Sequence, residues 1–130
     1  MRRAAILLAA LAIAAPALAQ TPIRFARGAS SAVVEGSVLR GERATYSIAA
    51  RAGQTMTLRI ASPEENAVFQ LYAPGARMAP EGVAGKPLPG AAEGEDARSW
   101  QGRLPANGTY LIVIGPTRGN AAYRLEVAVR

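Results

Sequence analysis

The chain has 130 residues, contains neither cysteine nor histidine, and carries a formal net charge of +6. The absence of these two residue types excludes Ser-His-Asp and Cys-His catalysis, together with transition-metal sites built from thiolate or imidazole ligands. No disulfide can form, so packing alone must hold the fold together.

The first 19 residues have the pattern of a secretory signal peptide. Arg2 and Arg3 precede an apolar stretch over residues 4–15, and Ala17-Leu18-Ala19 offers a small-x-small cleavage site. The apolar stretch is too short to span a bilayer as an anchor, and no second one follows. We therefore expect Sec-type export to the periplasm or cell exterior, no membrane insertion, and one domain over residues 20–130.

The rest of the chain alternates apolar and polar residues over short stretches, which predicts β-strands. Residues 110–114 are an unbroken run of β-formers and indicate a strand buried on both faces. Short connections at Gly41, Gly53 and residues 63–66 favour antiparallel pairing. We predict an all-β fold, a single antiparallel β-sandwich of about eight strands, around residues 23–25, 33–38, 45–48, 55–60, 69–71, 100–104, 110–114 and 123–129.

Two connections stand out. Asn107-Gly108 favours the positive φ angles of a tight hairpin leading into the 110–114 strand. Residues 74–97 form a long loop rich in proline and glycine, either functional or mobile, and its shortage of aromatic residues favours a mobile loop.

Aromatic residues lie in phase with the apolar faces of the expected strands, so we place them in the core. They are Tyr46, Trp100, Tyr110 and Tyr123.

Carboxylates are the remaining candidates for acid–base chemistry. Glu64-Glu65 falls in a turn, and Glu93, Glu95 and Asp96 lack calcium-loop spacing. A pair of carboxylates facing each other across a cleft, as in a glycosidase, stays open at this stage. Because no nucleophile has an activating partner, we expect no enzyme activity, no cofactor and no metal. Export and the absence of Lys-rich stripes with interleaved aromatics argue against nucleic acid.

Arg118 follows the central strand on a loop, where a guanidinium fork is suited to recognising a carboxylate. Four segments then resemble the periplasmic inhibitors of goose-type (g-type) lysozyme. They are FARGASSA (residues 25–32), TYSIAARAGQ (45–54), LPANGTY (104–110) and PTR (116–118), followed by Tyr123 and the last strand.

The resemblance implies a small antiparallel sandwich whose loops at one end enter a lysozyme-like substrate cleft and block it. Arg118 and Thr117 match the family's Thr-Arg position, and Asn120, Glu42 and Arg43 complete the expected partner-binding set. Members of this family carry a second arginine where this chain has Ala122, and an aromatic residue in the turn near Gly41.

An alternative function follows from a resemblance to pre-peptidase C-terminal domains. On that interpretation, the chain is a cell-envelope module that binds glycan or protein without inhibiting an enzyme. In both cases we expect a monomer.

Overall fold

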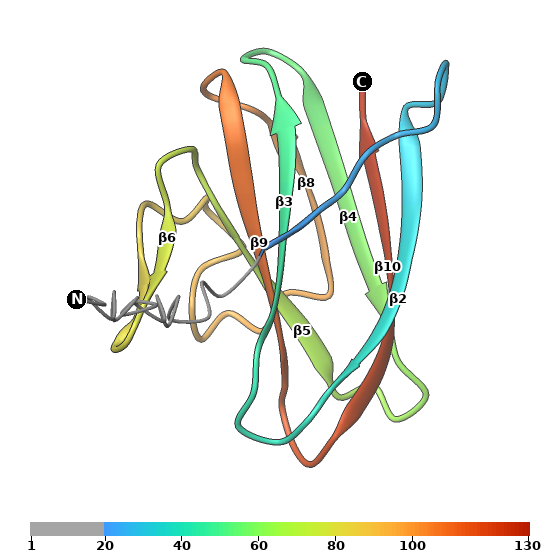
Figure 1. Ribbon diagram of the computed structural model, residues 1–130, viewed down its shortest axis with the longest axis vertical. Coiled ribbons are helices and arrows are strands. Elements are labelled where there is room, and N and C mark those ends of the chain that lie inside the picture. Colours follow the sequence, from blue (N-terminus) through green and yellow to red (C-terminus); the bar gives the residue numbers. More distant parts are fainter. Residues whose placement is uncertain (1–19) are drawn as a thin grey trace, which may run out of the picture.

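The computed structural model describes residues 20–130, so the predicted signal peptide lies outside the described residues. These residues form two four-stranded sheets packed face to face and a small two-stranded ribbon beside them (Figure 1). Within this range there is no helix long and apolar enough to cross a membrane.

The prediction of an all-β sandwich is confirmed, with ten strands in residues 20–130 in place of about eight. Pairing is antiparallel throughout the two sheets except between β1 and β3, which run parallel. In spatial order, sheet A contains β1 (Thr21–Pro22), β3 (Ala44–Ala50), β9 (Gly108–Pro116) and β5 (Ala67–Tyr72). Sheet B contains β2 (Ser31–Val38), β10 (Ala121–Val129), β4 (Thr55–Ala61) and β8 (Ser99–Arg103). The ribbon pairs β6 (Arg77–Ala79) with β7 (Gly82–Ala84).

Apart from β6 and β7, which pair with each other, strands that follow each other along the chain lie in opposite sheets. β2, β4, β8 and β10 belong to sheet B, whereas β3, β5 and β9 belong to sheet A. The short connections therefore cross between sheets, and the antiparallel partners are distant in sequence, as β3 and β9 are. Antiparallel pairing was predicted correctly, but it was inferred for strands that follow each other along the chain, which are not partners in the two four-stranded sheets.

The hairpin predicted at Asn107-Gly108 is wrong for the same reason, because β8 and β9 lie in different sheets. Gly108 has a positive φ of 141°, while Asn107 does not. The Asn107 side chain instead accepts a hydrogen bond through Oδ1 from the Ala52 amide, at 2.8 Å. A connection that crosses between sheets and a hairpin within one sheet both reverse the chain, so the turn residues alone do not distinguish the two.

The core lies between the sheets and is built from alternating residues. β4 shows the pattern most clearly, since Met56, Leu58 and Ile60 are buried while the residues between them face outward. The prediction that the 110–114 strand is buried on both faces is confirmed. On its outer side, Leu111 and Val113 pack with Tyr72 under the β6–β7 ribbon, where Ala76, Met78 and Val83 cover them.

The segment between β5 and β8, expected from its composition to be a loop without strands, contains two strands and packs against the sandwich. Besides forming β6 and β7, it lines the edge of β5: the Leu88 amide donates to the Leu71 carbonyl at 2.9 Å, and the Leu71 amide to the Ala91 carbonyl at 3.0 Å. Leu88, Ala91 and Ala97 are buried. A covered strand edge no longer offers unpaired amides to other chains.

Three of the four aromatic residues expected in the core are buried there, namely Tyr46, Tyr110 and Tyr123. Trp100 is only partly buried, because β8 is the edge strand of sheet B. Its indole Nε1 donates to the Pro89 carbonyl at 2.8 Å, so it fastens the 86–97 segment to the sandwich.

Candidate functional site

Three connections meet at one end of the sandwich, at the bottom of Figure 1, and we call this end the rim. It consists of residues 39–43 between β2 and β3, 62–66 between β4 and β5, and 117–120 between β9 and β10. All five residues that the sequence assigned to partner binding lie in these connections. The structure therefore brings them to one end, while their role in binding stays a prediction.

Hydrogen bonds lock the three connections together. The Thr117 amide donates to the Asn66 carbonyl at 2.8 Å, which joins the 117–120 loop to the 62–66 turn. Asn120 Oδ1 accepts from the Arg40 amide at 2.9 Å, which joins the same loop to the 39–43 turn. The rim is therefore held in shape before any partner arrives.

Asn66 is at the centre of this lock. It is the one polar residue among the buried side chains of residues 20–130, with 1% of its surface exposed. Its Nδ2 donates to the carbonyls of Arg118 at 3.0 Å and of Asn120 at 2.9 Å. From the sequence, Asn66 was expected only at the end of a turn, because its partners lie about fifty residues away along the chain.

Arg118 is exposed and its guanidinium folds back onto the neighbouring turn. Nη2 donates to the Glu64 carbonyl at 2.7 Å. An arginine has five N–H donors, so this bond orients the fork and leaves further donors for a carboxylate. Thr117 beside it is exposed as well.

Glu42 and Arg43 occupy the 39–43 turn, which the Glu42 amide closes by donating to the Leu39 carbonyl at 2.9 Å. Arg43 Nη1 donates to the Glu42 carbonyl at 2.8 Å. The Arg43 side chain lies over Gly115, where a Cβ would come within 2.9 Å of Arg43 Cδ. Gly115 thereby lets the arginine lie flat against sheet A, close to the 117–120 loop.

Two further residues of the rim were not predicted from the sequence. Arg40 lines a shallow hollow together with Gly41 and residues 116–119. Leu39 is exposed over 53% of its surface and lies in the same connection. Neither residue was part of the set expected from the sequence, and the folded arrangement places both at the rim.

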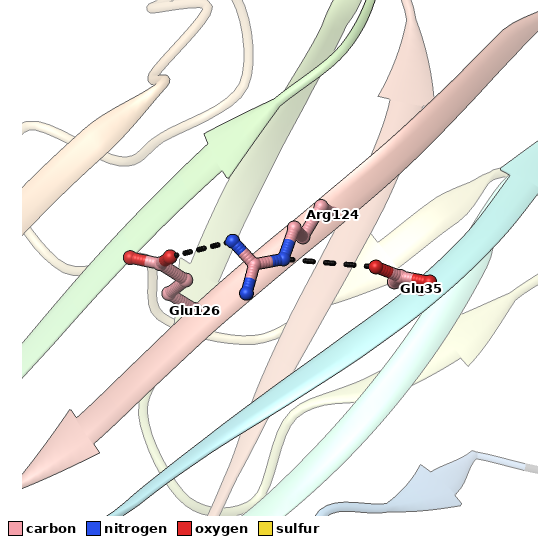
Figure 2. A network of polar contacts seen from close by, with 3 residues as sticks. All are labelled: Glu35, Arg124 and Glu126. Atoms are coloured by element: carbon pink, nitrogen blue, oxygen red, sulfur yellow. Dashed lines mark hydrogen bonds and ion pairs between the residues drawn. The ribbon is translucent and has the colours of Figure 1, made fainter.

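A separate charged cluster lies on the outer face of sheet B (Figure 2). Arg124 sits between two carboxylates, with Nε 3.6 Å from Glu35 Oε1 and Nη1 3.0 Å from Glu126 Oε1. All three side chains are at least half exposed on a strand face, so each pair contributes about 0–1 kcal/mol. The cluster is a solvated surface network, and its two carboxylates do not face each other across a cleft.

The fold and the rim define a class of protein. A disulfide-free sandwich with three connections locked into a rigid end is built to bind a partner, because the recognition groups sit on loops that a rigid scaffold positions. No protein-family model matches the chain, and a comparison with curated protein sequences finds no match.

Solved structures do match it. PliG from Aeromonas hydrophila, a periplasmic inhibitor of g-type lysozyme, is 34% identical, with a TM-score of 0.66 over 85% of this chain and 96% of that chain. Two other PliG structures share the fold, each over 85% of this chain and 97% of theirs. The Salmonella Typhimurium protein has 21% identity and a TM-score of 0.62, and an Escherichia coli PliG mutant has 22% and 0.61. The chain belongs to the PliG family, as the resemblance in its sequence indicated.

Proposed function

We propose that this protein is a periplasmic inhibitor of a g-type lysozyme and that it acts by binding rather than by catalysis. The observation that carries the proposal is the 34% identity to Aeromonas PliG over 96% of that chain. The rim supplies the contact surface, with Arg118 as the central residue and Thr117, Asn120, Glu42 and Arg43 around it.

The chemistry of the rim suits this target. Lysozymes cleave glycosidic bonds with carboxyl groups in a substrate cleft, and an arginine fork pairs with a carboxylate through short, charge-assisted hydrogen bonds. Arg40 and Arg43 add positive charge next to Arg118, which favours approach to an acidic cleft. Because hydrogen bonds already hold the connections together, less conformational entropy is lost on binding.

The test is lysis of cell-wall substrate by a g-type lysozyme, titrated with the protein and with Arg118→Ala. We expect the unaltered protein to inhibit and Arg118→Ala to weaken inhibition by about 30-fold, as for a charged residue at the centre of an interface. Arg77→Ala is the matched control, because Arg77 is an exposed arginine on β6, away from the rim. It should inhibit as the unaltered protein does.

Failure to inhibit at micromolar excess would overturn the proposal. It would leave the glycan- or protein-binding module, resembling pre-peptidase C-terminal domains, as the function of the sandwich. Equal inhibition by Arg118→Ala would keep the function but remove Arg118 from the contact.

The exported form in this proposal is a monomer that spans residues 20–130. Mass spectrometry of the periplasmic protein tests the cleavage after Ala19, and light scattering tests the monomer.

A further inference from the structure

The end of the sandwich opposite the rim carries arginine as its only charged residue type. It lies at the top of Figure 1, where the C-terminus is marked. We call it the basic end and define it by Arg27, Arg51, Arg103 and Arg130, all exposed. They come from four different segments of the chain, so the sequence does not show them as a cluster.

The strand register places two of these arginines side by side. Thr55, the first residue of β4, pairs with Arg103 on one side. On the other side, its amide donates to the Arg130 carbonyl at 2.7 Å, and its carbonyl accepts from the Arg130 amide at 3.0 Å. Residues opposite each other on neighbouring strands share a face, so Arg103 and Arg130 lie on the same face two strand spacings apart, about 10 Å.

The other two arginines lie in turns that touch this pair. The Arg103 guanidinium lies 3.6 Å from where a Cβ of Gly53 would stand, in the turn that begins at Arg51. Arg130 Nε lies 3.5 Å from Ser30 Oγ, just after the 26–29 turn that holds Arg27. A shallow hollow lined by Ala29, Ser30 and Arg51 joins the two turns.

No acidic residue lies in the segments that form the basic end, residues 26–30, 51–54 and 103–107. Both ion pairs found within residues 20–130 are formed by Arg124, so none of the four arginines of the basic end takes part in one. The four guanidinium groups together carry a charge of +4. The rim differs, because Glu42, Glu64 and Glu65 are interspersed among its arginines.

We propose that the basic end docks on the phosphate headgroups of an anionic membrane surface. Guanidinium forks fit phosphate oxygens, and each basic residue near an anionic lipid surface adds about 1 kcal/mol of attraction. The four arginines are spread across the end of a sandwich rather than gathered in a pocket, which suits a plane of many anions better than one ion. Ala29, Ala52 and Pro105, exposed between them, give no bulky side chain to insert, so the contact is peripheral.

Docking in this orientation turns the rim away from the membrane, because the two surfaces are at opposite ends of the sandwich. A protein held in this way presents Arg118 to the aqueous side. The inference does not depend on lysozyme inhibition, since it rests on different residues and has a different readout.

The experiment is co-sedimentation with vesicles at low ionic strength. Residues 20–130 are used, because the core lies within them and because an uncleaved leader would itself bind lipid. We expect binding to vesicles that contain phosphatidylglycerol and none to phosphatidylcholine alone. Each arginine lost should lower the partition coefficient about fivefold, so Arg51→Gln/Arg103→Gln should lower it about 25-fold.

The matched control is Arg59→Gln/Arg77→Gln, which removes the same charge from exposed positions away from the basic end. It should change binding by about twofold or less. If Arg103→Gln lowers the melting temperature, Arg27→Gln/Arg51→Gln replaces the test variant, because both residues lie in exposed turns.

Three results would overturn the proposal: no binding to phosphatidylglycerol vesicles, an equal loss of binding in the test and control variants, or full competition by glycerol phosphate at constant ionic strength. The last result would indicate a site for a single free anion in place of a lipid surface.

Discussion

At the residue scale, a pair of tyrosines joins the two sheets across the core. Tyr46 on β3 and Tyr123 on β10 share a hydrogen bond of 2.6 Å between their hydroxyls. Their rings meet edge to face, with centroids 6.4 Å apart and an interplanar angle of 85°. Gly36 makes room for the pair, because a Cβ there would come within 2.6 Å of the Tyr123 hydroxyl.

The tyrosine pair predicts a loss of stability at alkaline pH. Burial, and then the hydrogen bond to Tyr46, raises the pKa of Tyr123 well above its ordinary value of 10.0. In the unfolded chain this hydroxyl ionises near pH 10.0, while the fold keeps it protonated. The contribution of the Tyr123 hydroxyl to the free energy of unfolding is therefore fully present below pH 10.0 and is lost as pH rises further.

Tyr123→Phe tests this prediction. Urea denaturation should show a smaller decline in the free energy of unfolding above pH 10.0 than in the unaltered protein. At neutral pH the variant should be less stable by about 1 kcal/mol, because the Tyr46 hydroxyl loses its partner. An identical decline in both proteins would show that ionisation of Tyr123 is not the cause of the loss of stability.

Asn66→Ala should loosen the rim. Without the amide, the carbonyls of Arg118 and Asn120 lose their donor, which we expect to lower the free energy of unfolding by about 2–3 kcal/mol. Hydrogen exchange at the Thr117 amide should become faster. Asn107→Ala is the control, since Asn107 makes one exposed bond at the other end; it should leave exchange at the rim unchanged.

At the scale of elements, the β6–β7 ribbon acts as a cover. Met78 and Val83 lie over Leu111 and Val113, on the outer face of β9. Without this cover, the central strand would expose one apolar face to water.

Met78→Ala/Val83→Ala should therefore weaken the cover and cost about 2 kcal/mol of stability. We expect trypsin to cut the variant after Arg77 under conditions that leave the unaltered protein intact. Glu81→Ala, at the exposed tip of the ribbon, should resist trypsin as before. Equal resistance in all three proteins would show that the ribbon is held by other contacts.

Strand positions were predictable because alternation is a property of each strand alone, as in β4. The structure of residues 73–97 was not predictable in this way. Its order comes from backbone bonds to the edge of β5 and from Leu88 and Ala91 entering the core, and neither leaves a periodic pattern. Trp100 was in phase with the apolar face of its strand, but the periodicity of a strand does not reveal that β8 lies at the edge of its sheet.

At the scale of the molecule, every pairing in the two main sheets joins residues that are far apart in sequence, except the short parallel pair of β1 and β3. β3 at residues 44–50 pairs with β9 at 108–116, and β2 at 31–38 pairs with β10 at 121–129.

This topology predicts slow and cooperative folding. Loops must close before distant pairs form, so we expect refolding in milliseconds to seconds with a single transition. Stopped-flow fluorescence of Trp100, the one tryptophan, provides the measurement. Refolding within microseconds would show that local contacts dominate.

The sequence by itself determined the all-β class, the position of most strands, the absence of histidine and cysteine chemistry, and the family resemblance. These are properties of composition or of short segments. Only the tertiary structure decided which sheet each strand joins, that Asn66 locks the rim, and that four scattered arginines form one basic end. The physical reason is that a strand's partner depends on burying the apolar faces of all strands at once, and no segment carries that information alone.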